Sequence, residues 1–311
     1  MMTAKTSIKN GDLKSVLETH LFEGGSFERW SSAKKNIFEA LNAAPQIEIP
    51  SLNQCPRDSI VELKRRCSQV NFAIYQMTQP SEDLEKTVTD LVSFTSLFGL
   101  SLQEDHRSGG QNGVVALTPS AEESKKGYIP YTPRAINWHT DGYYNPAGSP
   151  IKSFLLHCHR PAESGGVNEV IDSEIAFMRM YEADPAMVAA FFHPQAMVIP
   201  ENVEKDGSVR PPSVGPVFFF DESSGRLQMR YTARTRSIEW RDDPATRNAS
   251  QWMREWLVSD EPYKLRIKLN AGQGILNNNV LHNRTEFFDD PASSKHRVML
   301  RVRFHDRIGE N

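Results

Sequence analysis

Two kinds of hydrophobic pattern alternate along the first hundred residues. In three segments, apolar residues recur every three or four positions, the spacing that buries one face of a helix. Two shorter segments have the alternating or β-branched and aromatic composition that is typical of strands. The helical segments are 1–45, 58–67 and 81–99, and the strand segments are 47–50 and 71–77. We expect Asp58 and Ser81 to cap the second and third helices, and we treat 1–100 as a mixed, largely helical segment.

The regular pattern stops over residues 101–135, where glycine, proline and charged residues replace periodic apolar positions. Residues 103–134 alone hold four glycines and three prolines. Connections of this length inside a domain usually cover a binding site or lack fixed structure. We interpret the segment as an active-site loop, and its composition fits a surface insertion equally well.

Short β-prone segments fill most of residues 136–311, punctuated by Gly, Pro and Asp. Two amphipathic stretches, 172–192 and 245–259, interrupt them and are predicted to be helical. The strand segments are 152–159, 166–172, 216–221, 226–233, 263–270, 272–283 and 296–306. So many strands leave exposed edges unless the sheet closes or doubles, so we expect a barrel or jelly roll. The predicted fold class is mainly β with flanking helices (α+β), as a single domain over 1–311.

Composition and charge exclude several classes of function. With 39% hydrophobic and 24% charged residues among 311, the chain has an ordinary globular composition. A formal net charge of -3 provides no basic field for nucleic acid. The sequence has no apolar run of about 18 residues and no apolar signal core at its start, so we expect neither membrane insertion nor secretion. Three scattered cysteines are typical of reduced thiols, and we expect a cytoplasmic protein.

Candidate chemistry begins in WHTDGYYNP, where His139 and Asp141 stand two positions apart. One such pair is close to what chance provides in a chain with 9 histidines, so a third ligand is needed. Residues two apart on a strand point to the same side, so a strand end can aim both at one ion. His282 is the best third candidate, near the end of a predicted strand over 274–283. Two histidines and a carboxylate are typical of non-haem iron sites that activate oxygen.

A further predicted strand starts at His296 and places Arg297 and Arg301 on one side. Arginine grips carboxylates through its planar fork, so this side would hold the far carboxylate of a small dicarboxylate bound to the metal. His157 and His159 also share a strand face, but no carboxylate is spaced with them, and we interpret both as packing residues.

Four motifs, in this order, resemble the taurine dioxygenase-like family of Fe(II)/2-oxoglutarate-dependent oxygenases. They are WHTDGYY, LLHCHRPAESGGVNEVID, GILNNNVLHNRTEFFDD and HRVMLRVRF, and the resemblance runs from about residue 47 to residue 307. Each motif alone is weak, whereas the ordered set is specific. The tract around WHTDGYY resembles the γ-butyrobetaine hydroxylase branch, and VLHNRTEFFDD is similar to clavaminate synthase-like members.

The resemblance implies a double-stranded β-helix (jelly-roll) core that holds Fe(II) through His139, Asp141 and His282. It also implies 2-oxoglutarate bound to the iron with its far carboxylate on Arg297, and O2 as the other cosubstrate. Asn168 stands where many members have a threonine that helps to hold 2-oxoglutarate, and its amide can still donate a hydrogen bond.

Two further positions bear on the substrate and the reaction. Arg301 matches a position that meets an anionic substrate group in some members and supports the cosubstrate in others. Asp141 is the carboxylate that halogenating relatives lose, so we expect oxygen transfer. Aromatic rings can hold a quaternary ammonium group and guanidinium can hold a carboxylate, which gives four candidate substrate contacts. These are Tyr143, Tyr144, Tyr231 and Arg234.

The sequence thus predicts a dioxygenase that hydroxylates, or otherwise oxidises, an unactivated C–H bond of a small polar carboxylate, amino acid or betaine, releasing succinate and CO2. The expected partner is a small-molecule substrate, with no nucleic acid and no membrane, and a homo-oligomer is left open. One alternative is a hydrolytic metal site on the same triad, although no general base is evident beside it. The other is a jelly roll that binds a ligand without turnover.

Overall fold

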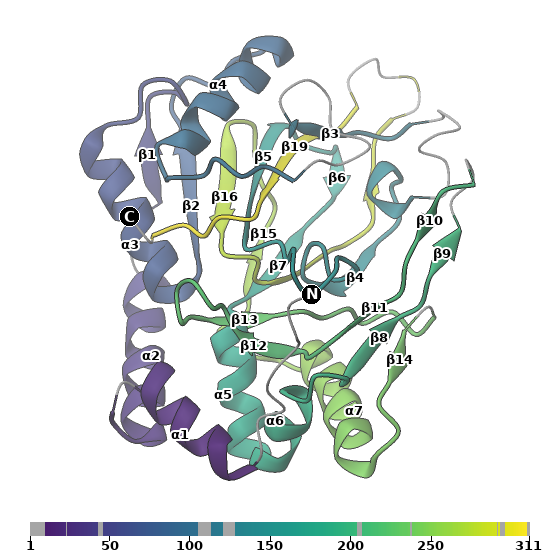
Figure 1. Cartoon of the computed structure of the whole chain (residues 1–311). Coiled ribbons are helices and arrows are strands. Elements are labelled where there is room, and N and C mark those ends of the chain that lie inside the picture. Colours follow the sequence, from purple (N-terminus) through teal and green to yellow (C-terminus); the bar gives the residue numbers. More distant parts are fainter. Residues whose placement is uncertain are drawn as a thin grey trace. The chain divides into compact units, whose positions relative to one another are not determined.

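The computed structural model (Figure 1) describes most of the chain as two compact units. The described residues are 10–22, 24–42, 46–104, 113–120, 128–203, 207–236, 238–290, 292 and 296–309. The sheet unit comprises Ile37–Asp141, Ile151–Asp172 and Lys264–Asn311. The helix unit comprises Met1–Asn36, Gly142–Pro150 and Ser173–Tyr263. A single oxygenase domain over the whole chain stays a prediction, because two compact units can belong to one enzyme.

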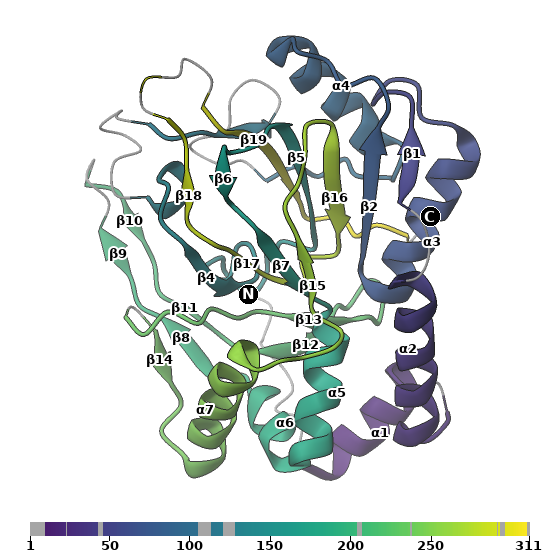
Figure 2. The ribbon, with the colours of Figure 1, turned by 180° about the vertical axis from the view of Figure 1, so that it is seen from behind.

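Two sheets dominate the sheet unit (Figure 2). The larger consists, in spatial order, of β1 (Ile47–Ile49), β2 (Phe72–Met77), β16 (Gln273–Asn277), β5 (Ser153–Arg160), β19 (Val298–Phe304) and β3 (Val115–Leu117). Only the β1–β2 pair among these is parallel. The smaller sheet is antiparallel and consists of β15 (Leu265–Ile267), β7 (Asn168–Ile171), β17 (Leu281–Arg284) and β4 (Ile136–His139). A separate pair joins β6 (Ser164–Gly165) to β18 (Phe287–Phe288).

The core of the sheet unit lies between the larger sheet and two helices. Helices α3 (Arg57–Val70) and α4 (Leu84–Ser96) contribute Leu63 and Phe94 to one buried cluster. Leu155 of β5 belongs to the same cluster. Because side chains alternate along a strand, the neighbouring residues of β5 point to the opposite face.

That opposite face of the larger sheet meets the smaller sheet. Phe154 and Leu156 of β5 line a narrow internal cavity together with Asn168 and Val170 of β7. The two sheets therefore face each other through their inner side chains, as in a jelly roll. Helices cover the outside of the larger sheet, so the structure agrees with the expected class, mainly β with flanking helices.

The helix unit contains most of the other helices. They are α1 (Asn10–His20), α2 (Phe27–Asn42), which begins in this unit and ends in the sheet unit, α5 (Ser173–Ala183), α6 (Pro185–Phe191) and α7 (Pro244–Val258). Short strands accompany them: β8 (Met197–Ile199), β9 (Asn202–Val203), β10 (Val209–Arg210), β11 (Ser213–Gly215), β12 (Phe218–Phe220), β13 (Leu227–Met229) and β14 (Glu239–Trp240). Phe177 of α5 packs edge-on against Phe218 of β12 in the aromatic core of this unit.

Helix starts differ from those expected. The residue before α3 is Pro56, which has no side-chain cap hydrogen bond, and Asp58 lies inside the first turn. The cap of α4 is Asp83, whose carboxylate accepts from the Lys86 N–H, while Ser81 stands two residues earlier. Both expected caps were therefore wrong: α3 begins at Arg57, one residue before Asp58, and Asp83 occupies the capping position of α4 in place of Ser81.

Two expected elements are each divided in the structure. The helix expected over 172–192 is broken into α5 and α6 at Pro185, because proline cannot donate the hydrogen bond that continues a helix. The prediction of one continuous strand over 274–283 is also wrong. It forms β16 and β17, which belong to different sheets and are separated by a turn in which Asn279 has a φ of 54°.

The expected active-site loop, 101–135, is described only in part. Its middle forms β3, which pairs with the edge of β19, and Ile129–Tyr131 forms a single 3-10 turn. His106 and the segments 105–112 and 121–127 lie outside the described residues. Whether this segment covers an active site stays a prediction.

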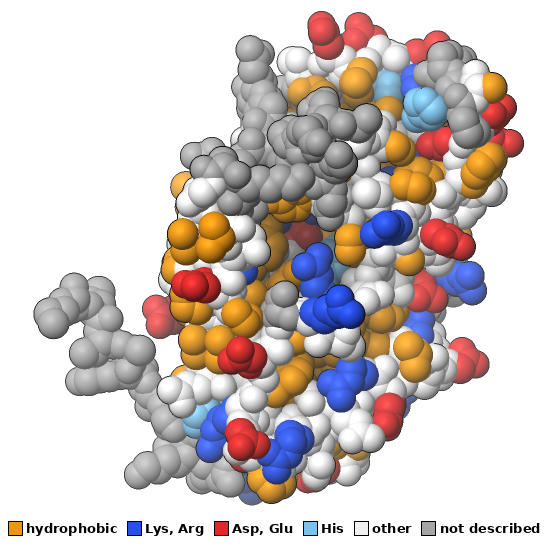
Figure 3. Space-filling model, turned by 90° about the vertical axis from the view of Figure 1, so that its right-hand side faces the viewer, with side chains coloured by type: hydrophobic (Ala, Val, Ile, Leu, Met, Phe, Trp, Pro, Cys, Tyr) orange, Lys and Arg blue, Asp and Glu red, His pale blue; other side chains and the backbone are white. Residues whose placement is uncertain are grey.

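The outer surface carries a mixture of side-chain types. On the face shown in Figure 3, acidic and basic side chains are interspersed with apolar ones. This mixture accords with the small net charge of -3. Among the described helices, none combines the length and the apolar composition that crossing a bilayer requires.

Candidate metal centre

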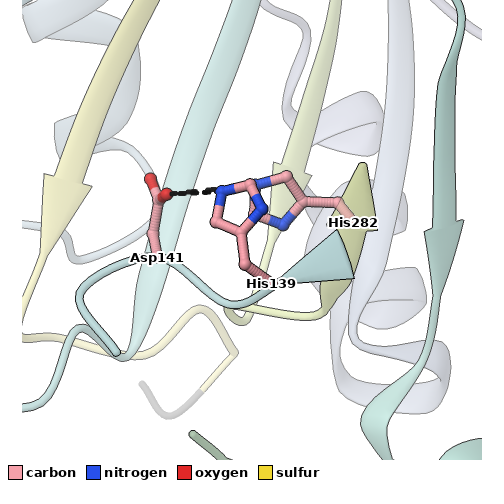
Figure 4. Close-up of side chains that lie close together, drawn as sticks. All are labelled: His139, Asp141 and His282. Carbon is pink, nitrogen blue, oxygen red and sulfur yellow. Dashed lines mark ion pairs between the residues drawn. The ribbon is translucent and has the colours of Figure 1, made fainter. Parts of the chain in front are cut away.

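Three side chains of the sheet unit converge at one end of the smaller sheet. His139 is the last residue of β4, and Asp141 lies in the turn that follows. His282 is on β17, directly opposite His139 in the antiparallel pairing, and the two ring centroids are 4.2 Å apart. Figure 4 shows both rings and the carboxylate pointing toward one another. Their potential ligand atoms all lie within 4.8 Å of one another.

Backbone hydrogen bonds set the orientation of both imidazole rings. The Nδ1 of His139 is 2.8 Å from the Asn137 carbonyl, and the Nδ1 of His282 is 2.9 Å from the Val280 carbonyl. A carbonyl only accepts, so each Nδ1 carries the hydrogen and donates it. In the neutral ring, each Nε2 therefore keeps its lone pair, and both Nε2 atoms face Asp141. This is the tautomer that a metal-binding histidine needs.

The charges at the site favour cation binding. Burial alone would raise the pKa of the Asp141 carboxyl, but the charge of the Arg301 guanidinium offsets burial, and that pKa is held well below its usual range. Burial, followed by the neighbouring His139, lowers the pKa of His282 to about 3. Near neutral pH the site thus offers an ionised carboxylate and a neutral His282 ring, which are the forms that bind metal.

The spacing of the three side chains also fits a single ion. The Oδ1 of Asp141 is 3.5 Å from Nε2 of His139 and 3.9 Å from Nε2 of His282. Divalent first-row metals bind nitrogen and oxygen ligands at about 2.0–2.2 Å, so two ligands of one ion lie roughly 3–4 Å apart. The residues present therefore fit a metal ion with one carboxylate and two imidazole ligands.

Arg297 lies in the same unit with an incompletely satisfied guanidinium. It is buried, with its guanidinium 4.9 Å from the centroid of the Phe287 ring. Its Nη1 is buried and has no hydrogen-bond partner among the described residues. A Cβ built on Gly166 would come within 3.6 Å of its Nε. A buried cation with an unused donor fits a site that is completed by an anion.

The structure also places Asn168 and Arg301 within the sheet unit. Asn168 lines the internal cavity together with His282. Arg301 reaches Asp141, with its Nη1 3.3 Å from the Asp141 Oδ2. Arg301 therefore acts directly on the candidate ligand carboxylate, a contact that the sequence did not reveal.

Arg284 was missed by the sequence reasoning. It follows His282 by two residues on β17 and donates from Nη2 to the carbonyls of Thr132 and Arg134. Its guanidinium is 4.8 Å from the Phe287 ring, which also contacts Arg297. The signal available in the sequence was an arginine two residues after His282, the spacing at which side chains of one strand point to the same side of the sheet.

The four candidate substrate residues all belong to the helix unit. The Tyr143 and Tyr144 rings meet edge to face at 5.2 Å, and the Arg234 guanidinium is 5.9 Å from the Tyr143 ring centroid. The Arg210 guanidinium is 5.8 Å from the Tyr144 ring centroid. Tyr231 is 0% exposed, and its ring centroid is 6.2 Å from that of Trp240, so its role as a substrate contact stays a prediction.

The second histidine pair has the packing role that we expected. Nδ1 of His157 is 2.9 Å from the Tyr75 hydroxyl, and the two rings are stacked. His159 lies 3.4 Å from the Thr87 hydroxyl. Among the described residues, the one group of three or more potential metal-binding side chains is the His139, Asp141 and His282 cluster.

Two sequence relatives act on a nucleotide according to their names. A uridine-5'-phosphate dioxygenase of Amycolatopsis sp is 30% identical over 167 residues, covering 52% of this chain and 58% of the relative. A uridine-5'-phosphate dioxygenase of Streptomyces sp is 29% identical over 180 residues, covering 55% of this chain and 62% of the relative. The chain thus spans about three fifths of the length of these relatives.

A solved structure supports the fold assignment. The asparagine oxygenase in complex with Fe(II), 2S,3S-3-hydroxyasparagine and succinate superposes with a TM-score of 0.60 at 13% identity. The superposition covers 90% of this chain and 84% of that protein, which confirms the expected fold class. The family model "Taurine catabolism dioxygenase TauD, TfdA family" matches residues 79–303, well over half of the sequence. The chain therefore belongs to the taurine catabolism dioxygenase TauD, TfdA family.

Proposed function

We propose that this chain is an Fe(II)- and 2-oxoglutarate-dependent dioxygenase that oxidises a C–H bond of a small polar, anionic substrate. The observation that carries the proposal is the cluster of His139, Asp141 and His282. Two imidazoles and one ionised carboxylate converge on one point, from facing strands and the turn beside them. Family membership supports the same chemistry.

The three ligands would hold Fe(II) and leave its remaining positions for cosubstrate and oxygen. When bound, the iron with 2-oxoglutarate and O2 supplies the oxidation: one oxygen atom enters the product, and 2-oxoglutarate leaves as succinate and CO2. Arg301 keeps the Asp141 carboxylate ionised, so that it can bind the metal.

The binding of 2-oxoglutarate is assigned to Arg297 and Asn168. The buried Nη1 of Arg297 can donate to the far carboxylate of the cosubstrate. Asn168 lines the cavity that also contains His282 and can donate a second hydrogen bond.

Two classes of substrate are proposed. The first is a small polar carboxylate, amino acid or betaine, which is the class expected from the sequence. The second is a nucleoside 5'-monophosphate, favoured by the two uridine-5'-phosphate dioxygenases among the relatives. The Tyr143 and Tyr144 rings with nearby Arg234 and Arg210 suit this class, because rings stack on bases and guanidinium binds phosphate.

The test is anaerobic titration of the protein with Fe(II) and 2-oxoglutarate, followed by visible absorption. We expect a weak metal-to-cosubstrate charge-transfer band that His282→Ala abolishes. The control is His157→Asn, because His157 is a second histidine of the sheet unit, is buried, and is bonded to Tyr75 rather than to a candidate ligand. A missing band in the unmodified protein, or a band unchanged in His282→Ala, would overturn the proposal.

A succinate-release screen then distinguishes the substrate classes. One panel contains amino acids, small carboxylates and betaines, and the other contains nucleoside 5'-monophosphates. Oxygen consumption coupled to succinate formation separates oxidation from hydrolysis, which uses no oxygen. Product mass identifies the atom gained or lost. Substrate-dependent succinate from neither panel would contradict both substrate proposals.

A further inference from the structure

Three consecutive asparagines are buried where β16 passes into β17: Asn277 ends β16, and Asn278 and Asn279 lie in the turn that follows. Each side chain bonds to a different part of the sheet unit. The Asn277 amide donates to the Phe154 carbonyl on β5. The Asn278 side chain exchanges hydrogen bonds with the backbone of Ile308 and also donates to a carbonyl of α3. These contacts give each asparagine a separate structural partner.

Asn279 is the member of the turn that contacts a candidate metal ligand. Its Oδ1 accepts from the Asp141 N–H at 2.7 Å, and its Nδ2 donates to the Asp141 carbonyl at 2.9 Å. The same Nδ2 donates to the Ile151 carbonyl at 2.7 Å. The Asn279 side chain therefore bonds to both backbone groups of Asp141, the N–H and the carbonyl.

The hydrogen bonds from Asn279 take the place of the backbone hydrogen bonds that Asp141 would make within a β-sheet. Asp141 lies beyond the end of β4, outside the ladder that pairs β4 with β17. A buried N–H or carbonyl without a partner is costly, so Asn279 both satisfies and locates this backbone. Asparagine suits the position because it tolerates the positive φ of 54° better than other side chains and carries both a donor and an acceptor.

We propose that Asn279 is a positioning residue that sets the Asp141 carboxylate at its distance from His282. The backbone of Asn279 runs directly into β17, which carries His282, while its side chain holds Asp141. One residue therefore fixes the separation of two ligands from distant parts of the sequence. The inference rests on the proposed function, because it assigns a role in assembling the metal site.

The test variant is Asn279→Gly. Glycine adopts positive φ without strain, so the turn is kept and only the side-chain hydrogen bonds are lost. The matched control is Asn71→Gly. Of the described residues other than glycine, Asn71 and Asn279 are the two with positive φ, and each is 3% exposed. The Asn71 side chain bonds to Asp172 and Arg307, neither of which is a candidate ligand.

Two measurements on the full chain separate positioning from stability. Thermal unfolding of the metal-free protein is expected to show a lower Tm for both variants, since each loses buried hydrogen bonds. Anaerobic Fe(II) titration is expected to show affinity reduced about 10- to 100-fold in Asn279→Gly, as for other residues that orient metal ligands. Asn71→Gly is expected to retain the affinity of the unmodified protein.

If Asn279→Gly does not fold, Asn279→Asp replaces it in the same titration, with the same expected loss. It keeps the acceptor for the Asp141 N–H and removes the donors to the Asp141 and Ile151 carbonyls. Unchanged affinity in the folded Asn279 variant, or an equal loss in Asn71→Gly, would refute the positioning role while leaving the proposed function standing. If the unmodified protein binds no Fe(II), the proposed function and this inference fail together.

Discussion

Arg230 of the helix unit and Arg297 of the sheet unit are both buried, and burial lowers the pKa of each to about 10. Their surroundings differ. Every nitrogen of the Arg230 guanidinium donates to main-chain carbonyls, among them those of Tyr143 and Met197, and it also donates to the hydroxyl of Ser213. The Nη1 of Arg297 has no partner among the described residues. The two arginines are thus alike in burial and pKa. They differ in the unsatisfied Nη1 donor of Arg297, which makes Arg297 the one suited to bind an anionic ligand.

The largest expected effect is on Arg297. In Arg297→Gln we expect 2-oxoglutarate affinity to fall about 100-fold, because a charge-assisted pair with the cosubstrate carboxylate is lost. The free energy of unfolding without cosubstrate should change by less than about 1 kcal/mol, since no complete hydrogen-bond set is broken. Anaerobic calorimetry and urea unfolding measure the two quantities. An unchanged affinity would remove Arg297 from the cosubstrate site.

Arg230→Gln is the opposite case. Its loss leaves several buried carbonyls without donors, so we expect the free energy of unfolding to fall by about 2–4 kcal/mol. Affinity for 2-oxoglutarate should stay within about twofold of the unmodified protein, because the guanidinium is already saturated by backbone. Urea unfolding and cosubstrate titration test this pair of outcomes. If Arg230→Gln were as stable as the unmodified protein but bound 2-oxoglutarate more weakly, Arg230 rather than Arg297 would have the properties of a cosubstrate residue.

Phe287 tests the stacking that orients Arg297. The ring lies within 4.9 Å of the Arg297 guanidinium and 4.8 Å of that of Arg284. In Phe287→Leu we expect 2-oxoglutarate affinity to fall by about three- to fivefold, the size of a cation–π contact. Phe288→Leu is the control, since the neighbouring Phe288 is exposed. An equal loss in both variants would show that ring stacking on Arg297 is not the cause.

The smallest expected effect concerns the cooperativity of the two units. The chain passes between them at residues 36, 141, 150, 172 and 263, five covalent connections. We therefore expect both units to unfold in one transition in urea. Cysteine labelling reports the sheet unit, which holds all three cysteines, and fluorescence mainly reports the helix unit, which holds four of the five tryptophans. Separate midpoints for the two probes would show that each unit is stable alone.

The candidate metal ligands could be selected from the sequence because their signals are local, and the structure brings their side chains together, while their role as ligands stays a prediction. His139 and Asp141 stand together in one short motif, and a motif of the same family contains His282. The long helices and most strands were also predictable from apolar spacing. The predicted helices and strands overlap the observed ones, but the residues predicted to cap two helices differ from the observed Pro56 and Asp83.

The remaining features depend on contacts between distant segments. The break between β16 and β17 carries no glycine or proline, so Asn277 to Val280 read as the continuation of a strand. Only the tertiary partners of Asn279 explain why the chain turns there. In the same way, the contact of Arg301 with Asp141 follows from the alignment of β19 in the sheet, which no local pattern encodes.

The chain leaves the smaller sheet after β7 and returns at β15, and those two strands are direct neighbours, with Val170 opposite Leu265. Residues Ser173–Tyr263 are thus inserted between strands that pair with each other. The entropy of closing such a loop grows slowly, by about 0.6 kcal/mol per doubling of its length. A lineage can therefore lengthen, diversify or exchange this insertion while β7 still pairs with the strand that carries His282.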